Sequence, residues 1–305
     1  MLEGLRSPNI HTPQNLSEFS SIIQHYPTSS FWAGGTYIMS RKFSYPSNAT
    51  NEEIIYLGSI EELRRFQRND RVAEFGSMVS LYELITTGKT ILPKILVDTI
   101  QSFGGNIATG RITIGGSLAT RDFRSSLPGT LNLFDASCEV RYMKKKRMHS
   151  KWFSLMQIYD KSGRLNLPAN ALISRIRINL AEKSFQKFLV RGEFFPHSDN
   201  AVSLAVTGNL DQDNFNDARL SLTYPDYGFI SNHDLDNTLS SARFPLDQSE
   251  SRSVEEAILE IAGATFPHLS HLQKIRTRGL VREMLNELNI NALTTTSIED
   301  TSSNI

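Results

Sequence analysis

The sequence predicts a protein of mixed helices and strands in two domains. Two patterns lead to this prediction: windows with helical periodicity, and short alternating or β-branched runs that end at glycine. The third observation is size. The chain has 305 residues, of which 39% are hydrophobic, enough for a sizeable core and, at about 150 residues each, for two domains.

The N-terminal elements favour a small mixed sheet. Asn15 and Glu18 have the spacing of a capping box, and apolar residues recur on one helical face after them, so we expect a helix over about 16–25. Short apolar runs at 30–33 and 54–57 are typical of strands. Helix and strands together indicate a βαβ-like beginning.

The central part of the chain alternates between helical and strand patterns. The segment 71–76 predicts a half-buried strand, Ser80 begins a helix, and a second helix follows Pro93. The β-branched run at 111–114 is strand-like and leads into a glycine pair. Strands are expected at 138–142 and 173–180. We interpret the basic run between them, 143–147, as a hairpin turn with solvated lysines rather than a polyanion site.

The remaining residues indicate a second domain. Strands are expected at 202–210 and 218–224, and amphipathic helices near 253–263 and 272–288. We therefore expect a first domain over 1–181 and a second over 182–293. Residues 294–305 are rich in Thr, Ser and Asn without an apolar period, which predicts a disordered tail.

Composition narrows the function. Thirty-two basic residues balance thirty-two acidic ones, so no global field attracts nucleic acid or an anionic membrane. Cys138 is the single cysteine, which rules out an internal disulfide and an all-cysteine iron–sulfur cluster, because such a cluster takes four thiolates. Neither a signal peptide nor a membrane span is evident, so we expect a soluble, cytoplasmic protein.

Two Gly-Gly loops are the strongest chemical signal. Each follows a strand-like run, and each has a threonine close by, Thr36 and Thr113. Glycine lets backbone amides approach a phosphate without an intervening Cβ, and successive amides form an anion-binding concavity. A tight turn is the simpler explanation for either pair alone. Neither loop matches the phosphate-binding loop of nucleotide triphosphatases or the dinucleotide fingerprint.

Together these stretches resemble the FAD-binding subunits of molybdenum hydroxylases, a family that includes xanthine dehydrogenase and carbon monoxide dehydrogenase. The segment 31–38, Phe-Trp-Ala-Gly-Gly-Thr-Tyr-Ile, is similar to that family's V/L-x-A-G-G-T-D-L loop. The segment 113–117, Thr-Ile-Gly-Gly-Ser, is similar to its T-I-G-G-N loop, and 76–84 is similar to its G-A-x-x-T-x-x-E-L stretch. The resemblance covers most of residues 12–290 in order.

The resemblance implies an α+β fold: a PCMH-type FAD-binding domain in two lobes, then a smaller C-terminal α+β domain of antiparallel sheet and helices. It implies non-covalent FAD, with its pyrophosphate wrapped by the amides of both glycine loops. No side chain is expected to act as a catalytic acid, base or nucleophile, and no metal site is expected. The residues expected to bind FAD are Phe31, Trp32, Ala33, Gly34, Gly35, Thr36, Tyr37, Ile38, Phe103, Thr113, Ile114, Gly115, Gly116, Ser117, Asp122, Ile173 and Lys187.

The resemblance also implies partners. A molybdopterin-binding large subunit and a small [2Fe–2S] subunit would lie on separate chains, and this oxidoreductase subunit would pass electrons through FAD to NAD+ or another acceptor. Three departures from the family pattern leave an alternative open: Tyr37, the triplet Ala108-Thr109-Gly110, and Ser126 at a position where the family commonly has aspartate. The alternative is a flavin-free structural or docking subunit that retains the fold. A stand-alone flavin reductase or oxidase ranks below both.

Overall fold

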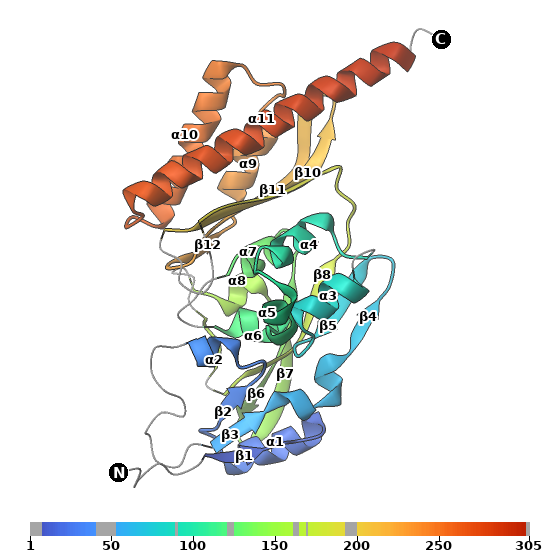
Figure 1. Cartoon of the computed structure of the whole chain (residues 1–305), viewed down its shortest axis with the longest axis vertical. Helices are drawn as coiled ribbons and strands as arrows, with labels where there is room; N and C mark the ends of the chain where they lie inside the picture. Colours follow the sequence, from blue (N-terminus) through green and yellow to red (C-terminus); the bar gives the residue numbers. More distant parts are fainter. Residues whose placement is uncertain are drawn as a thin grey trace. The chain divides into compact units, whose positions relative to one another are not determined.

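The structure is a computed structural model that describes residues 8–40, 53–88, 91–120, 125–160, 165–168, 170–192 and 200–302, with residues 40 and 295–302 as backbone only. Figure 1 shows the order of its helices and strands along the chain. They group into two compact units. Unit 1 contains Met1–Leu92, Ile100–Arg121 and Asp135–Leu180, and unit 2 contains Pro93–Thr99, Asp122–Phe134 and Ala181–Ile305.

Unit 1 begins with a three-stranded sheet in the order β1-β3-β2. Its strands are β1 (Asn9–His11), β2 (Ser30–Trp32) and β3 (Glu53–Tyr56), and all pairs are parallel. Helix α1 (Leu16–His25) has the predicted bounds, and the Asn15 side chain caps it by accepting the Glu18 amide. Phe19 and Ile23 of this helix pack on Ile55 of the sheet because these three face the same small core.

The second sheet of unit 1 is antiparallel and five-stranded, in the order β4-β5-β8-β6-β7. Its strands are β4 (Phe66–Arg68), β5 (Val72–Gly76), β6 (Ser137–Lys144), β7 (Arg147–Ser154) and β8 (Leu172–Asn179). Lys145 and Lys146 have φ of 50° and 60° and form the tight turn between β6 and β7. The predicted lysine hairpin is therefore confirmed, since two successive positive φ values are typical of a two-residue hairpin turn.

Short helices complete unit 1. They are η1 (Leu57–Ser59), η2 (Glu61–Arg64), α2 (Thr36–Ser40), α3 (Leu81–Thr87), α5 (Asn106–Arg111), α6 (Ile114–Ala119) and α8 (Leu155–Ile158). Helix α3 begins as predicted, because Ser80 and Glu83 form a capping box. The strand expected before the second glycine pair is wrong: that run is the end of α5, an isolated bridge between Thr113 and Ser80, and then α6. The β-branched side chains are used here in a cap rather than in a ladder.

Unit 2 contains a four-stranded antiparallel sheet in the order β12-β11-β10-β9. Its strands are β9 (Phe185–Arg191), β10 (Val202–Asp211), β11 (Asn214–Tyr224) and β12 (Gly228–Ile230). Its helices are α7 (Leu127–Asn132), α9 (His233–Ser240), α10 (Gln248–Thr265) and α11 (His271–Ser302), while α4 (Lys94–Gln101) begins in the Pro93–Thr99 segment. All the elements expected for the second domain are present.

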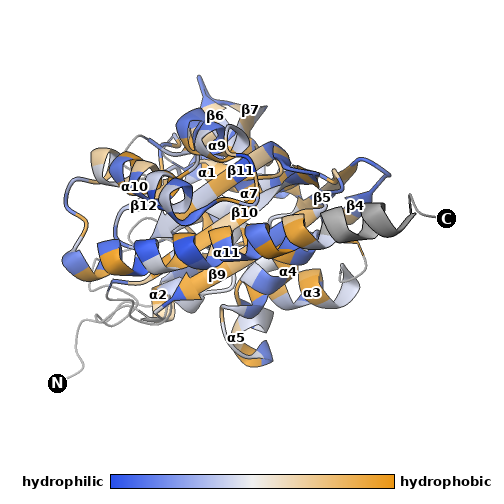
Figure 2. Cartoon of the chain, turned by 90° about the horizontal axis from the view of Figure 1, so that it is seen from above, coloured by the Kyte–Doolittle hydropathy of each residue, from blue (hydrophilic) through white to orange (hydrophobic). Residues whose placement is uncertain are grey.

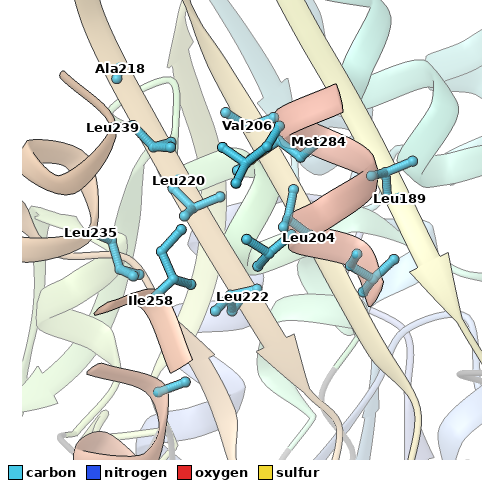
Figure 3. Close-up of a cluster of buried hydrophobic side chains, with 14 of the residues drawn as sticks. Leu189, Leu204, Val206, Ala218, Leu220, Leu222, Leu235, Leu239, Ile258 and Met284 are labelled. Carbon is cyan, nitrogen blue, oxygen red and sulfur yellow. The ribbon is translucent and has the colours of Figure 1, made fainter. Parts of the chain in front are cut away.

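Alternate side chains of the central strands form the core of unit 2. Leu204 and Val206 of β10 and Leu220 and Leu222 of β11 point to the side where α9, α10 and α11 contribute Leu239, Ile258 and Met284, as Figure 3 shows. The period of two follows from strand geometry, in which successive side chains face opposite sides of the sheet. Figure 2 shows hydrophobic and hydrophilic residues alternating along α11, as expected of a helix packed on one face.

The C-terminal helix is longer than the sequence indicates. Helix α11 continues to Ser302, whereas a disordered tail was expected from 294. Once a packed helix exists, each further residue adds a backbone hydrogen bond without a new nucleation step, so the Thr-rich segment extends it. Of the helices in the described ranges, none combines the length and apolar character that crossing a membrane requires.

Candidate functional site

The first glycine loop connects β2 to α2 in unit 1. Gly35 has a φ of 75°, and a Cβ on it would lie 2.4 Å from the indole Nε1 of Trp32. Glycine is therefore required here by both conformation and space. The amide of Met39 donates to the carbonyl of Gly35 at 2.9 Å, which closes the first turn of α2. The amides of Thr36 and Ile38 precede that bond, and a helix offers such amides no intrahelical acceptor.

The second glycine loop is the N-terminus of α6. Thr113 is the N-cap, and its Oγ1 accepts the amide of Gly116 at 3.1 Å. The other amides of 114–117 are also engaged inside the protein: they donate to Val79 O (3.0 Å), Ser77 O (2.9 Å) and Thr113 O (2.9 Å). These internal bonds make the loop rigid. What Thr113 retains is its O–H, because a hydroxyl that accepts one hydrogen bond still has a proton to donate.

The two loops lie against each other, although they are far apart in sequence. A Cβ on Gly34 would lie 1.7 Å from the carbonyl oxygen of Arg111 and 3.5 Å from Cγ2 of Thr113. A Cβ on Gly116 would be 3.8 Å from Cβ of Ala33. The absence of a side chain at Gly34 is what lets the backbones approach this closely. The sequence-based expectation of two glycine loops at a single site thus has a direct geometric counterpart.

Ser77 joins this site, although it was not among the residues expected from the sequence. A Cβ on Gly115 would lie 2.4 Å from Cβ of Ser77, and the Ser77 carbonyl accepts the Gly115 amide. The Ser77 side chain is buried, and its Oγ has no hydrogen-bond partner. The sequence signal was slight: Ser77 lies in the 76–84 stretch, but only the fold shows that its hydroxyl is unsatisfied.

A buried ionic network supports the strand next to Ser77. The Ser77 amide donates to the Ser174 carbonyl, and the Ser174 hydroxyl donates to Glu139 Oε2 at 2.6 Å. Arg175 binds the same carboxylate with two nitrogens, at 2.9 and 3.1 Å. Burial alone would raise the pKa of Glu139, but hydrogen bonds from Arg175, Ser174 and Ser150 lower that pKa to about 2. The network is a rigid platform for β8 and for the segment that carries Ser77.

The remaining expected residues have separate positions. Phe103 lies in unit 1 just after α4 and is partly buried, and Ile173 is buried in β8. Asp122 lies outside the described residues. Lys187 lies in β9 of unit 2, where its Nζ forms an ion pair with Glu287 of α11 at 2.6 Å.

Comparison with solved structures shows the fold. The chain is similar to quinoline 2-oxidoreductase from Pseudomonas putida 86, with 18% identity, a TM-score of 0.73, and coverage of 94% of this chain and 98% of the other. It is also similar to a carbon monoxide dehydrogenase from Hydrogenophaga pseudoflava (15%, 0.75, 92% and 96%) and to a Cu,Mo-containing CO dehydrogenase (15%, 0.76, 92% and 96%). No curated protein matches the sequence significantly.

The family is decided by the first half of the chain. Residues 6–180 match the sequence model described as the FAD binding domain in molybdopterin dehydrogenase. The site is compatible with that cofactor, because it combines two glycine backbones in contact, helix-start amides and a buried hydroxyl without a partner. The chain therefore belongs to the FAD-binding family of molybdopterin dehydrogenases, a class of oxidoreductases, and its cofactor is FAD.

Proposed function

We propose that this chain is the electron-relay subunit of a molybdenum hydroxylase of the xanthine dehydrogenase type. Electrons would arrive from [2Fe–2S] clusters on a small partner subunit and leave through FAD to NAD+ or another acceptor. A separate molybdopterin subunit would oxidise the substrate. Support comes from the family match and from the likeness to quinoline 2-oxidoreductase and to Cu,Mo-containing CO dehydrogenase, both oxidoreductases by name.

The observation that carries this proposal is the contact between the two glycine loops. Gly34 and Gly35 bring the start of α2 beside Thr113 at the start of α6. We assign pyrophosphate binding mainly to the first loop, whose amides at Thr36 and Ile38 have no intrahelical acceptor. The second loop contributes the Thr113 hydroxyl and a rigid wall, because its own amides are already engaged.

This chain's residues position the cofactor and do not perform acid–base chemistry. FAD, when bound, supplies the redox chemistry, while the protein controls its orientation and electrostatics. The chain's one cysteine, Cys138, is buried, and burial raises the pKa of its thiol to about 12. A neutral, enclosed thiol is a poor metal ligand or nucleophile. Four thiolates for an all-cysteine cluster must therefore come from another chain.

A flavin-free docking subunit is the competing function. It is favoured by the internal pairing of the amides at 114–117, together with Tyr37 and Ser126 at positions where the family pattern differs. Both functions predict association with molybdenum- and iron-containing partners, so association alone does not separate them. Flavin content does.

The test is affinity capture of the tagged full chain from its native host, followed by assay of FAD, molybdenum and iron in the same fractions. We expect all three to co-elute with the wild-type chain. Gly116→Asp places a carboxylate where a Cβ already lies 2.7 Å from Thr113 Oγ1, so FAD should be lost while molybdenum and iron remain. Metals without flavin in the wild-type fractions would support the docking function, and flavin without either metal would contradict the relay.

A further inference from the structure

Ser77 presents a hydroxyl that the folded chain leaves unused. The residue is 4% exposed, and its Oγ has no hydrogen-bond partner. Burying a hydroxyl without a partner is unfavourable, so such groups in native proteins call for an explanation by a ligand, an ion or a water molecule. We propose that the Ser77 hydroxyl donates a hydrogen bond to the pyrophosphate of FAD. This inference rests on the proposed binding of that pyrophosphate at the glycine loops.

Comparison with the other unpartnered oxygens favours Ser77. Within the described part of the chain, the buried side-chain oxygens without a partner belong to Glu62, Ser77, Thr207 and Ser221. Thr207 and Ser221 lie in the sheet of unit 2. Glu62 carries a carboxylate, which would repel a phosphate, whereas a serine hydroxyl is a donor that needs no change of charge. Ser77 alone of the four packs on a glycine of the two loops.

The backbone around Ser77 is held on two sides, so its side chain has a defined position. Its amide donates to Ser174 O at 3.0 Å, and its carbonyl accepts the Gly115 amide at 2.9 Å. Gly115 leaves the space that a side chain would otherwise take, since a Cβ there would lie 2.4 Å from Ser77 Cβ. The hydroxyl is therefore preorganised beside the start of α6, and a ligand that accepts its proton removes the cost of leaving it unpaired.

The experiment compares Ser77→Ala with Ser221→Ala in the full chain. Both substitutions remove one buried, unpartnered hydroxyl, at residues that are 4% and 1% exposed, but only Ser77 contacts a glycine loop. The first readout is the dissociation constant of FAD, measured by quenching of flavin fluorescence. The second is the melting temperature of each protein without FAD, which reports whether the variant is folded.

We expect Ser77→Ala to weaken FAD binding about tenfold, the usual size of one hydrogen bond to a charged acceptor. Ser221→Ala should stay within about twofold of the wild type. Without FAD, both variants should melt no lower than the wild type, because each has lost an unsatisfied group. Unchanged FAD affinity in Ser77→Ala, or an equal loss in both variants, would overturn the role of Ser77. A wild-type chain that binds no FAD would overturn the proposed function itself and this inference with it.

Discussion

At the residue scale, the contact between the glycine loops depends on Gly34 having no side chain. Its hypothetical Cβ would overlap a backbone carbonyl, that of Arg111, at 1.7 Å. A flexible side chain could rotate away from such a clash, but a backbone oxygen in α5 moves only with its helix. Gly34 is therefore needed for packing as well as for access to a phosphate.

Gly34→Ala is expected to separate the loops and to lower the free energy of unfolding by about 3 kcal/mol, at the upper end for an added methyl group in a packed site. FAD affinity should fall with it. Gly110→Ala is the matched control, because a Cβ on Gly110 meets nothing within 4 Å. Urea unfolding and FAD titration of both variants check the prediction. Equal behaviour of the two would show that the loops do not depend on close approach at Gly34.

Glu139 predicts how stability depends on pH. Its pKa falls from 4.5 to about 2 on folding, so the folded state favours the ionised form. The resulting stabilisation, about 3 kcal/mol at 1.36 kcal/mol per pKa unit, is fully present above pH 4.5 and is lost as pH falls toward 2. Glu139→Gln should therefore destabilise the protein at pH 7 and reduce the loss of stability between pH 4.5 and 2. Parallel pH profiles of the two proteins would contradict this assignment.

Individual site residues differ in how well the sequence predicts them. The two glycine loops follow from local patterns, and their contact agrees with a shared site. Ser77 was missed, because the satisfaction of a hydroxyl depends on neighbours that are distant in sequence, here Gly115 and Ser174. The ion pair of Lys187 with Glu287 was not foreseen either, since the two residues are brought together only by packing of α11 on β9.

At the element scale, capping residues and apolar periodicity predict the helices well. Asn15 and Ser80 mark the beginnings of α1 and α3 because their side chains accept amides that the helix itself cannot pair. The start of α6 was predicted as a strand, since its β-branched residues suggest one. Thr113 instead uses its hydroxyl as an N-cap, a tertiary choice that residue preference alone does not reveal.

Helix α11 carries a prediction of its own. Gly279 lies on the exposed side of this helix, and a Cβ there meets nothing within 4 Å. Gly279→Ala should raise the free energy of unfolding by about 1 kcal/mol, because alanine loses less backbone entropy in a helix. Gly192→Ala, at a φ of 84° and beside Arg276, should lower it. Urea unfolding distinguishes the two, and destabilisation by Gly279→Ala would contradict the helix as described.

At the scale of the whole molecule, each unit is assembled from three segments of the chain. Two consecutive domains, 1–181 and 182–293, were expected, but Pro93–Thr99 and Asp122–Phe134 group with the C-terminal unit. Local patterns predict the elements in these segments and carry no information about which core they join. Gly129 of α7 illustrates the point: its Cβ position lies 2.5 Å from Ser221 Oγ, a contact more than ninety residues away in sequence.

The central claim is that this chain binds FAD at the two glycine loops of unit 1. The most direct test is the visible absorption spectrum of the purified full-length chain before and after incubation with FAD and removal of free flavin. We predict flavin absorbance that elutes with the protein at close to one FAD per chain in the wild type and is absent from Gly34→Ala. A wild-type chain that shows no flavin absorbance and takes up no added FAD would contradict the account.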